Sequence, residues 1–354
     1  MGQVRIMGLE LEELESLFRE WNQPSYRARQ VFEWVHRHAV TNPDQMTNIP
    51  GQLREELRQK LLFATAREVE RARAEDGTVK FLLELEDGLH IETVLMRQSH
   101  GNTACVSSQV GCRWRCPFCA SGKRGLSRNL EPGEMVEQVL RARRLLCRDG
   151  QDLDNLVLMG MGEPLDNLEN CLKFVRIVRA PEGVNLGVRR ISISTVGIVP
   201  GIRRLAEEEI PITLSVSLHA PNDQLRRRLL PAARAHRLGE LMEACRDFFK
   251  ATGRRVTFEY IMIQEVNDLL EQARELGSLL ENMQSHVNLI PLNPVAQSGW
   301  RASTPDRVEA FARVLRRRGR ISVTIRRPRG LGVEAACGQL AGRRAEGVRR
   351  GNRK

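Results

Sequence analysis

The stretch CVSSQVGCRWRCPFCASG, residues 105–122, holds four of the eight cysteines in a chain of 354 residues. Cys112, Cys116 and Cys119 form a CxxxCxxC pattern shortly after an apolar run. In a reducing compartment, thiols gathered in this way are more typical of metal binding or catalysis than of disulfide bonds. Three thiolates at this spacing can hold three irons of a 4Fe-4S cluster and leave the fourth iron open to a substrate or cofactor.

A structural zinc site is the alternative for the same cysteines. It requires a fourth Cys or His at a matching spacing, and the sequence directly after Cys119 offers none, although Cys105 could be recruited from upstream. In that case the chain would be a non-catalytic RNA-binding protein. The colour of the anaerobically purified protein separates the two alternatives, because a zinc protein is colourless and a protein with an iron–sulfur cluster is brown.

Strand-like apolar runs alternate with helical segments on the C-terminal side of residue 103. The expected strands cover residues 103–108, 155–160, 190–195, 212–220, 255–263, 286–293 and 322–327. The expected helices cover residues 133–146, 167–178, 199–208, 238–252, 269–283 and 305–318. Six or seven repeats of strand and helix predict a parallel sheet, either doubly wound or rolled into a full or partial barrel.

Several of these strands end in polar or glycine-rich residues. They are Gly160 to Glu163, Ser194 with Thr195, Ser217 to His219, and Asn293. Because the chemistry of parallel α/β folds lies at the C-terminal ends of the strands, these side chains are candidates for a shared site.

The chain divides into three parts by pattern. Residues 8–63 read as amphipathic helices, and residues 66–97 contain a β-hairpin that turns at Asp87-Gly88. We therefore expect a helical accessory module with its hairpin over residues 1–95, an α/β core over 96–340, and a basic, disordered tail over 341–354.

The net charge of +11 favours a polyanionic partner, because Lys and Arg that neutralise phosphates release counterions. Arginines are concentrated late, in RRRGR at 316–320 and RRPR at 326–329. The sequence contains no run of eighteen apolar residues and does not start like a signal peptide, which predicts a cytoplasmic protein without a membrane partner.

The cysteine pattern CRWRCPFC resembles the signature of the radical S-adenosylmethionine (SAM) superfamily. In that superfamily the amino and carboxylate groups of SAM chelate the open iron, and GMGEP at 160–164 looks like its Gly-Glu strand end. Seven blocks match more closely, and in order they resemble the RlmN and Cfr family of RNA adenine methyltransferases. The blocks are CVSSQVGC, GLSRNL, MGMGEPL, ISISTVGIVPGIRRLAEE, SLHAPND, HVNLIPLNP and AACGQL.

This resemblance covers about the last three quarters of the chain, and the helical N-terminal part resembles the RNA-binding accessory domain of the family. It implies a partial (β/α)6 radical SAM barrel with a 4Fe-4S cluster on Cys112, Cys116 and Cys119. The SAM-binding residues that it implies are Gly162, Glu163, Ser194, Ser217, Leu218, His219 and Asn293.

The resemblance also implies a mechanism that uses two SAM molecules per turnover. Cys337, in AACGQL, first accepts a methyl group from one SAM. A second SAM, reduced by the cluster, yields a radical that removes hydrogen from this methyl group, and the carbon radical adds to adenine. Cys105 then releases the RNA by forming a disulfide with Cys337, and Glu92 is the base that removes the adenine proton.

Two segments, HVNLIPLNPV and IRRPRG, resemble those of the enzymes that methylate carbon 2 of adenine more than those of the antibiotic-resistance enzymes, which methylate carbon 8. Methylation of carbon 8 remains the alternative. The implied substrates are 23S rRNA near the peptidyl-transferase centre and the adenosine 3' of the anticodon in tRNA. A flavodoxin or ferredoxin would supply electrons to a monomeric enzyme. The chain departs from the family pattern at residues 230–236 and 330–334.

Overall fold

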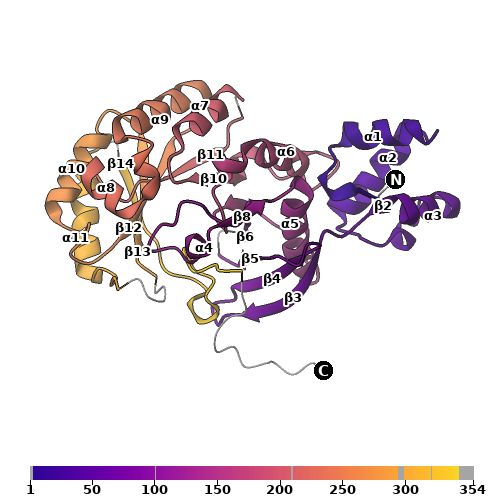
Figure 1. Cartoon of the computed structure of the whole chain (residues 1–354), viewed down its shortest axis with the longest axis horizontal. Coiled ribbons are helices and arrows are strands. Elements are labelled where there is room, and N and C mark those ends of the chain that lie inside the picture. The colour runs from indigo at the N-terminus through magenta and orange to yellow at the C-terminus, as the bar shows by residue number, and fades with distance from the viewer. Residues whose placement is uncertain (1–2, 100, 209, 294–298, 320, 343–354) are drawn as a thin grey trace.

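The protein is described by a computed structural model over residues 3–99, 101–208, 210–293, 299–319 and 321–342. Ten strands form one continuous sheet in the order β14-β13-β12-β11-β10-β9-β6-β5-β4-β3. The predicted basic tail falls outside these residues apart from Ala341 and Gly342. Figure 1 shows the N-terminal helices at one end of the molecule and the last strand–helix repeats at the other.

Seven neighbouring strands of this sheet run parallel. They are β6 (Thr103–Cys105), β9 (Asn155–Leu158), β10 (Ile191–Thr195), β11 (Thr213–Ser217), β12 (Val256–Met262), β13 (Ser285–Pro291) and β14 (Ile321–Ile325). The register places Ser217 beside Glu259, Glu259 beside Asn288, and Asn288 beside Thr324. Polar side chains of four strands are therefore held at one level of the sheet.

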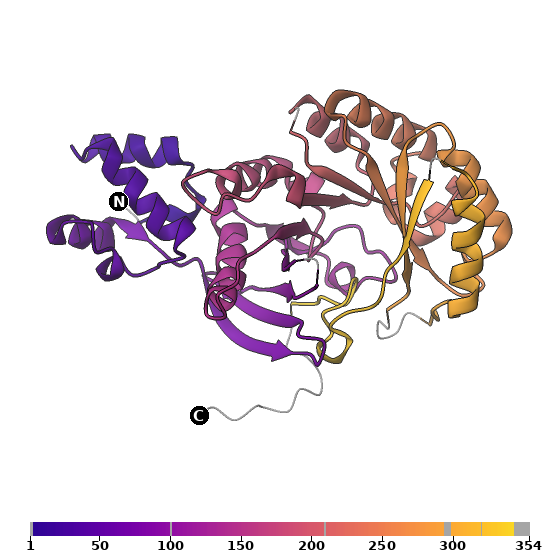
Figure 2. The ribbon, with the colours of Figure 1, turned by 180° about the vertical axis from the view of Figure 1, so that it is seen from behind.

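Helices connect these strands and pack along the outer side of the curved sheet, as Figures 1 and 2 show. They are α5 (Pro132–Cys147), α6 (Leu168–Arg179), α7 (Val199–Glu207), α8 (Asp223–Leu229), α9 (Leu238–Thr252), α10 (Leu270–Leu280) and α11 (Pro305–Arg316). Each helix of nine or more residues turns an apolar face to the core because its apolar residues recur at helical spacing. The predicted alternation and the open, partial barrel are confirmed.

The hairpin of the N-terminal part belongs to the same sheet. Strands β3 (Ala66–Arg73), β4 (Val79–Leu85) and β5 (His90–Met96) are antiparallel, and β5 pairs with β6 of the parallel half. The boundary predicted at residue 95 therefore lies within β5, and strands β5, β4 and β3 extend the sheet beyond β6.

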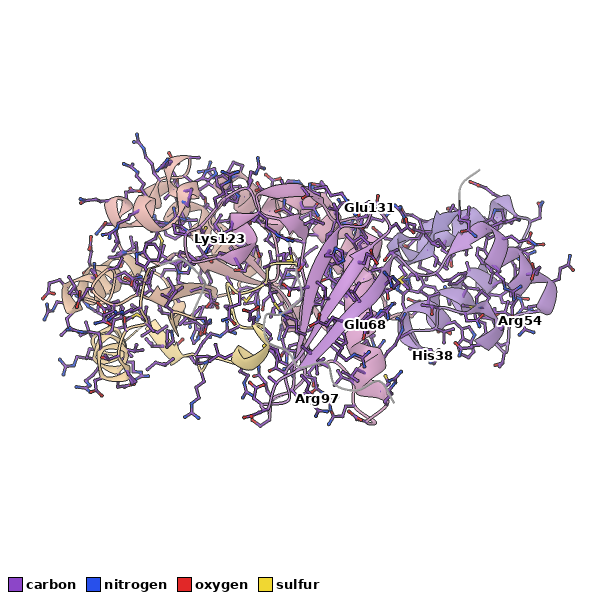
Figure 3. The ribbon with its side chains drawn as sticks, turned by 60° about the horizontal axis from the view of Figure 1, so that its bottom comes forward. His38, Arg54, Glu68, Arg97, Lys123 and Glu131 are labelled. Atoms are coloured by element: carbon purple, nitrogen blue, oxygen red, sulfur yellow. The ribbon has the colours of Figure 1, made fainter. Side chains whose placement is uncertain are left out.

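The N-terminal module is helical, as expected. It consists of α1 (Leu11–Glu20), α2 (Ser25–Phe32), a π-helical turn (Glu33–Arg37), α3 (Gly51–Lys60), and the short parallel strands β1 (Val4–Arg5) and β2 (Leu61–Leu62). Figure 3 places its labelled residues His38 and Arg54 at one end of the molecule. Arg143 of α5 holds the module by donating to the carbonyl oxygens of His36 and Arg37.

Within the described parts of the chain, no helix combines the length and apolar character that a membrane crossing requires. The buried apolar residues of the N-terminal helices, the sheet and the outer helices belong to one large core cluster. A second, smaller cluster under the cysteine loop contains Cys116, Phe118, Leu230 and Ile263.

Candidate active site

The three cysteines of the CxxxCxxC pattern lie in a loop between β7 (Gln109–Gly111) and α4 (Ala120–Lys123). Strand β7 pairs with β8 (Leu126–Asn129), which closes the base of this cysteine loop. Gly111 has a φ of +80°, and a Cβ there would lie 1.9 Å from the carbonyl oxygen of Gly125. The hydrogen bond from the Cys112 N–H to that same carbonyl, 3.0 Å long, requires this close approach.

The outer side of the cysteine loop is tied to the neighbouring strand end. Arg113 makes a bidentate pair with Asp166 at 2.8 and 2.7 Å, and the indole N–H of Trp114 donates to the same carboxylate at 2.7 Å. The loop therefore has a fixed position before any ligand binds, as a cofactor site requires.

The thiols of this loop lie close enough to influence one another. Burial raises the pKa of Cys112 to about 12, with Cys119 adding to the increase. Burial also raises the pKa of Cys116 well above its usual value, with contributions from Cys119 and Cys112. Cys119 is half-buried. Three thiolates gathered in one loop need a cationic centre between them, which an iron–sulfur cluster supplies because a coordinated thiol is deprotonated.

No group of three or more His, Cys, Asp and Glu side chains in the described parts is arranged to hold a single metal ion. A cluster makes a different demand, since each of its cysteines binds a separate iron. The loop fits this requirement because Cys112, Cys116 and Cys119 all face one cavity.

This first cavity lies at the C-terminal ends of the parallel strands, where the sequence predicted the site. It brings together the cluster cysteines with most of the predicted SAM-binding residues. The predicted residues that line it are Cys112, Cys116, Cys119, Gly162, Glu163, Ser194, Ser217, His219, Asn293 and Cys337. Leu218 is the exception among the SAM-binding set, because its side chain is fully buried in the main core.

Glu163 supplies the buried carboxylate of the cavity. Its oxygens accept hydrogen bonds from the backbone N–H groups of Leu165 at 3.0 Å and Val196 at 2.8 Å. Burial nevertheless raises the pKa of Glu163 to about 7. A bound ammonium group would restore the ionised form, so this position suits the amino group of SAM.

The glycines of GMGEP allow this strand end to lie against residues 107–109. A Cβ on Gly160 would come within 2.7 Å of Ser107, and one on Gly162 within 2.6 Å of Gln109. The Gln109 side chain in turn accepts from the Glu163 N–H at 2.8 Å. The two glycines of the motif are therefore needed because the strand end packs closely against residues 107–109, and this packing sets the position of Glu163.

His219 has a left-handed backbone conformation, with a φ of +58°, that is uncommon outside glycine. Its Nδ1 accepts from the Ile261 N–H at 3.1 Å, which leaves the ring proton on Nε2. Burial lowers the pKa of His219 to about 3, with Arg226 contributing. His219 therefore faces the cavity as a neutral hydrogen-bond donor.

Asn293 links the cofactor cavity to the segment that carries Cys337. Its Nδ2 donates to the Cys337 carbonyl oxygen at 3.0 Å, whereas its buried Oδ1 has no hydrogen-bond partner in the structure. An unsatisfied buried acceptor that lines a cavity is the feature expected of a residue awaiting a ligand hydroxyl or amine. The residues present therefore fit SAM.

Cys337 lies at the junction of the first cavity with a second one, which Cys105 also lines. Cys337 is solvent accessible, yet the surrounding protein raises the pKa of its thiol by desolvation, against the opposing effect of Arg326. Burial raises the pKa of Cys105 to about 12. All eight cysteines are free in the structure, so the disulfide that we expected between Cys105 and Cys337 is not present.

Two family models match the chain. The radical SAM superfamily model covers residues 106–280, and the model of the ribosomal RNA large subunit methyltransferase N-terminal domain covers residues 4–62. A Symbiobacterium thermophilum protein named "Probable dual-specificity RNA methyltransferase RlmN" is 49% identical over 345 residues, covering 97% of this chain and 92% of that protein. The chain belongs to the RlmN family of radical SAM RNA methyltransferases.

A second RlmN relative and a solved structure support the same family assignment. A Bacillus subtilis protein of the same printed name is 44% identical over 335 residues, covering 95% of this chain and 92% of that protein. The crystal structure of a radical SAM methyltransferase from Sphaerobacter thermophilus has a TM-score of 0.93 and 47% identity, covering 96% of this chain and all of that one. The chain is thus an enzyme rather than a non-catalytic zinc protein, and the predicted family and barrel are confirmed.

Glu92, the base that the RlmN resemblance implies, lies outside both cavities. It is buried on β5, with one carboxylate oxygen 2.9 Å from the Lys80 ammonium group. The other oxygen accepts from the N–H groups of Ala341 at 2.5 Å and Gly342 at 2.9 Å. Glu92 is therefore no solvent-facing hairpin residue, and its role as a base stays a prediction.

Glu259 was not among the residues expected from the sequence, and Arg326 was expected there only as part of the basic run at 326–329. Both residues line the first cavity of this RlmN-family protein. Glu259 accepts from Asn288 at 3.0 Å, and its other oxygen lies 3.9 Å from Arg326. A usable signal was present, since a glutamate in the middle of an otherwise apolar strand such as VTFEYIM has to meet a partner or a ligand.

Proposed function

We propose that this enzyme methylates carbon 2 of an adenosine in RNA by way of an S-methyl group on Cys337. The observation that supports the proposal is the position of Cys337 at the junction of two cavities, one of which is lined by the three cysteines of the CxxxCxxC pattern and by six of the seven residues expected to bind SAM. A methyl carrier has to meet both the cofactor and the RNA base, and this junction allows both contacts.

Side chains at the ends of the parallel strands bind SAM. Glu163 attracts the amino group, and Asn293 accepts from a SAM hydroxyl or amine through its free Oδ1. Ser194, Ser217 and neutral His219 offer hydrogen bonds to the ribose and carboxylate. When bound, the cluster supplies the electron that cleaves SAM homolytically, chemistry that no protein side chain offers.

Cys337 acts as the nucleophile that takes the first methyl group. Its thiolate form is the reactive one, and Arg326 lies on the same cavity walls with a charge that favours that form. Two SAM molecules are consumed per turnover, one as the methyl source and one as the radical source. Cys105 faces the second cavity together with Cys337, and we propose it as a further catalytic residue of this site.

The RNA substrates proposed are 23S rRNA, before the peptidyl-transferase centre is buried by ribosome assembly, and the adenosine 3' of the anticodon in tRNA. The net charge of +11 supports a polyanionic substrate. A flavodoxin or ferredoxin supplies the electrons, and the enzyme works as a cytoplasmic monomer.

The test is nucleoside mass spectrometry on naked 23S rRNA and on tRNA after incubation with cluster-loaded enzyme, SAM and a reductant. We expect 2-methyladenosine in both RNAs, and less in mature ribosomal subunits than in naked rRNA. Appearance of 8-methyladenosine in its place would overturn the carbon-2 assignment and favour the carbon-8 alternative.

A further inference from the structure

Arg226 carries a positive charge in the interior of the protein without a carboxylate partner. It lies on α8 and is fully buried. The described residues contain two other buried Lys or Arg side chains, Lys80 and Arg143, and each of these pairs with a carboxylate. Within the described parts of the chain, the guanidinium group of Arg226 bonds only to backbone carbonyl oxygens. A buried charge normally requires a counter-charge, so this arrangement calls for an explanation.

The hydrogen bonds of Arg226 leave its charge uncompensated. Its Nη2 donates to the Val196 carbonyl oxygen at 2.6 Å and its Nη1 to that of His236 at 3.2 Å, while its buried Nε has no hydrogen-bond partner among the described residues. Burial lowers the pKa of Arg226 to about 10, and the nearby Asp223 carboxylate opposes this effect only in part. Arg226 therefore remains a cation at neutral pH, and its surroundings favour an additional negative charge.

Arg226 lies directly behind one wall of the first cavity. Val196 lines that cavity, and its carbonyl oxygen accepts from Arg226 while its N–H donates to Glu163 at 2.8 Å. Gly197 permits the close approach, because a Cβ there would lie 2.7 Å from the Arg226 Nη2. One residue of backbone, Val196, therefore separates the guanidinium group from the Glu163 carboxylate.

The end of α8 packs beneath the cysteine loop. Leu229 and its neighbour Leu230 share the smaller core cluster with Cys116, and Leu230 and Cys116 both line the first cavity. The positive charge of Arg226 and the negative charge of a Cys116 thiolate attract each other through this packed region. Arg226 is therefore electrostatically coupled to the cysteine loop.

We propose that Arg226 is the fixed counter-charge of the cluster site and that it raises the reduction potential of the 4Fe-4S cluster. The reduced cluster carries one more negative charge than the oxidised cluster, so a nearby buried cation stabilises the reduced form more strongly. The electron comes from the flavodoxin or ferredoxin of the proposed function, on which this inference rests, and no proton moves. Arg226 does not line the cavity, so it acts through its electric field and is not a catalytic residue.

A purely structural role is the alternative for Arg226. In that case the hydrogen bonds to the Val196 and His236 carbonyl oxygens would be its whole contribution. The unpartnered Nε and the missing carboxylate argue against this alternative. A neutral amide donor would serve the same carbonyl oxygens at a lower desolvation cost than a buried cation.

Four variants separate the charge of Arg226 from its hydrogen bonds. Arg226→Gln removes the charge and keeps an amide donor, whereas Arg226→Lys keeps the charge because the anionic cluster favours the protonated amine. Arg227→Gln removes an exposed charge from the same helix. Leu241→Ala loosens the packing beside Arg226 without changing any charge, since Leu241 and Arg226 both lie against Gly197.

The experiment is a redox titration of anaerobically purified, cluster-loaded protein without SAM or RNA. Electron paramagnetic resonance measures the amount of reduced cluster at each poised potential. At a fixed potential, we expect the ratio of reduced to oxidised cluster to be about tenfold lower in Arg226→Gln than in the wild type, which for one electron is a midpoint potential about 59 mV lower. The other three variants should keep the wild-type ratio, and all should contain equal iron and sulfide.

An unchanged ratio in Arg226→Gln with full iron content would overturn the inference. Equal decreases in Arg226→Gln and Arg226→Lys, or in Arg226→Gln and Leu241→Ala, would also overturn it, because they would assign the effect to lost contacts. Arg226→Met takes the place of Arg226→Gln if that variant does not hold its cluster, and the same decrease is expected of it.

The titration also separates this inference from the proposed function. If the wild-type enzyme holds its cluster but forms no 2-methyladenosine, the proposed function fails, while the titration still decides on Arg226. A wild-type protein that binds no iron would overturn both.

Discussion

The backbone N–H of Ala120 donates a 2.7 Å hydrogen bond to the carbonyl oxygen of Gly338. Ala120 directly follows Cys119, a proposed cluster ligand, and Gly338 directly follows Cys337, the proposed methyl carrier. This bond therefore ties the two segments together across 218 residues of sequence. Relative placement of the two thiols is therefore a property of the backbone, and the first prediction follows from it.

Gly338→Ala should disturb the position of Cys337 without removing a thiol. Gly338 has a φ of +83°, and a Cβ there would lie 2.9 Å from the Phe118 carbonyl oxygen. Strain of about 1–3 kcal/mol is expected. Methyl gain by Cys337, followed by mass spectrometry, should slow at least about tenfold, with cluster content unchanged. Gly332→Ala, with open space around it, is the control, and equal rates in the two variants would refute this placement.

Cys119→Ala should abolish the iron–sulfur cluster. With one of three ligands lost, anaerobically purified protein should be colourless and low in iron and sulfide. Cys245→Ala changes a cysteine that is buried on α9 away from the cavity, and it should stay brown. Iron and sulfide analysis checks both variants. Full iron content in Cys119→Ala would remove this cysteine from the ligand set.

SAM binding should weaken as the pH falls below about 7. Burial raises the pKa of Glu163 to about 7, so the carboxylate becomes neutral below that value and no longer attracts the SAM ammonium group. The Kd should rise about fivefold between pH 7 and pH 6. Calorimetric titration of cluster-loaded protein measures it. In Glu163→Gln binding should be weak and independent of pH, and a flat profile in the wild type would contradict the assignment.

Arg326→Gln should make Cys337 less reactive at neutral pH. The Arg326 cation lowers the pKa of the Cys337 thiol, and Glu259 raises it. Removing Arg326 therefore leaves less thiolate at a given pH, and Glu259→Gln leaves more. Iodoacetamide alkylation, followed on the Cys337 peptide across pH, should shift to higher pH in the first variant and to lower pH in the second. Arg316→Gln, which alters an exposed pair on α11, should not shift the profile, and shifts of equal sign in the two test variants would contradict the account.

The sequence predicted the parallel part of the fold well because its signals are local. Alternation of strand and helix follows from hydrophobic spacing, and polar residues such as Ser217 and Asn293 mark the strand ends that meet at one edge. The GMGEP motif was recognised only by its resemblance to the Gly-Glu strand end, and the close approach of its glycines to Ser107 and Gln109 needed the structure.

The burial of Glu92 could not be predicted from the local sequence. A glutamate in a hairpin is normally exposed, and its burial here depends on Lys80 and on Ala341, which is 249 residues away. Contacts of this kind arise from the fold as a whole.

The most direct test of the account is peptide mass spectrometry on anaerobically purified, cluster-loaded protein incubated with SAM. We predict one added methyl group on the peptide that contains Cys337, and none on that peptide in Cys337→Ala. An unmodified Cys337 in a protein that contains its cluster and binds SAM would contradict the methyl-carrier mechanism.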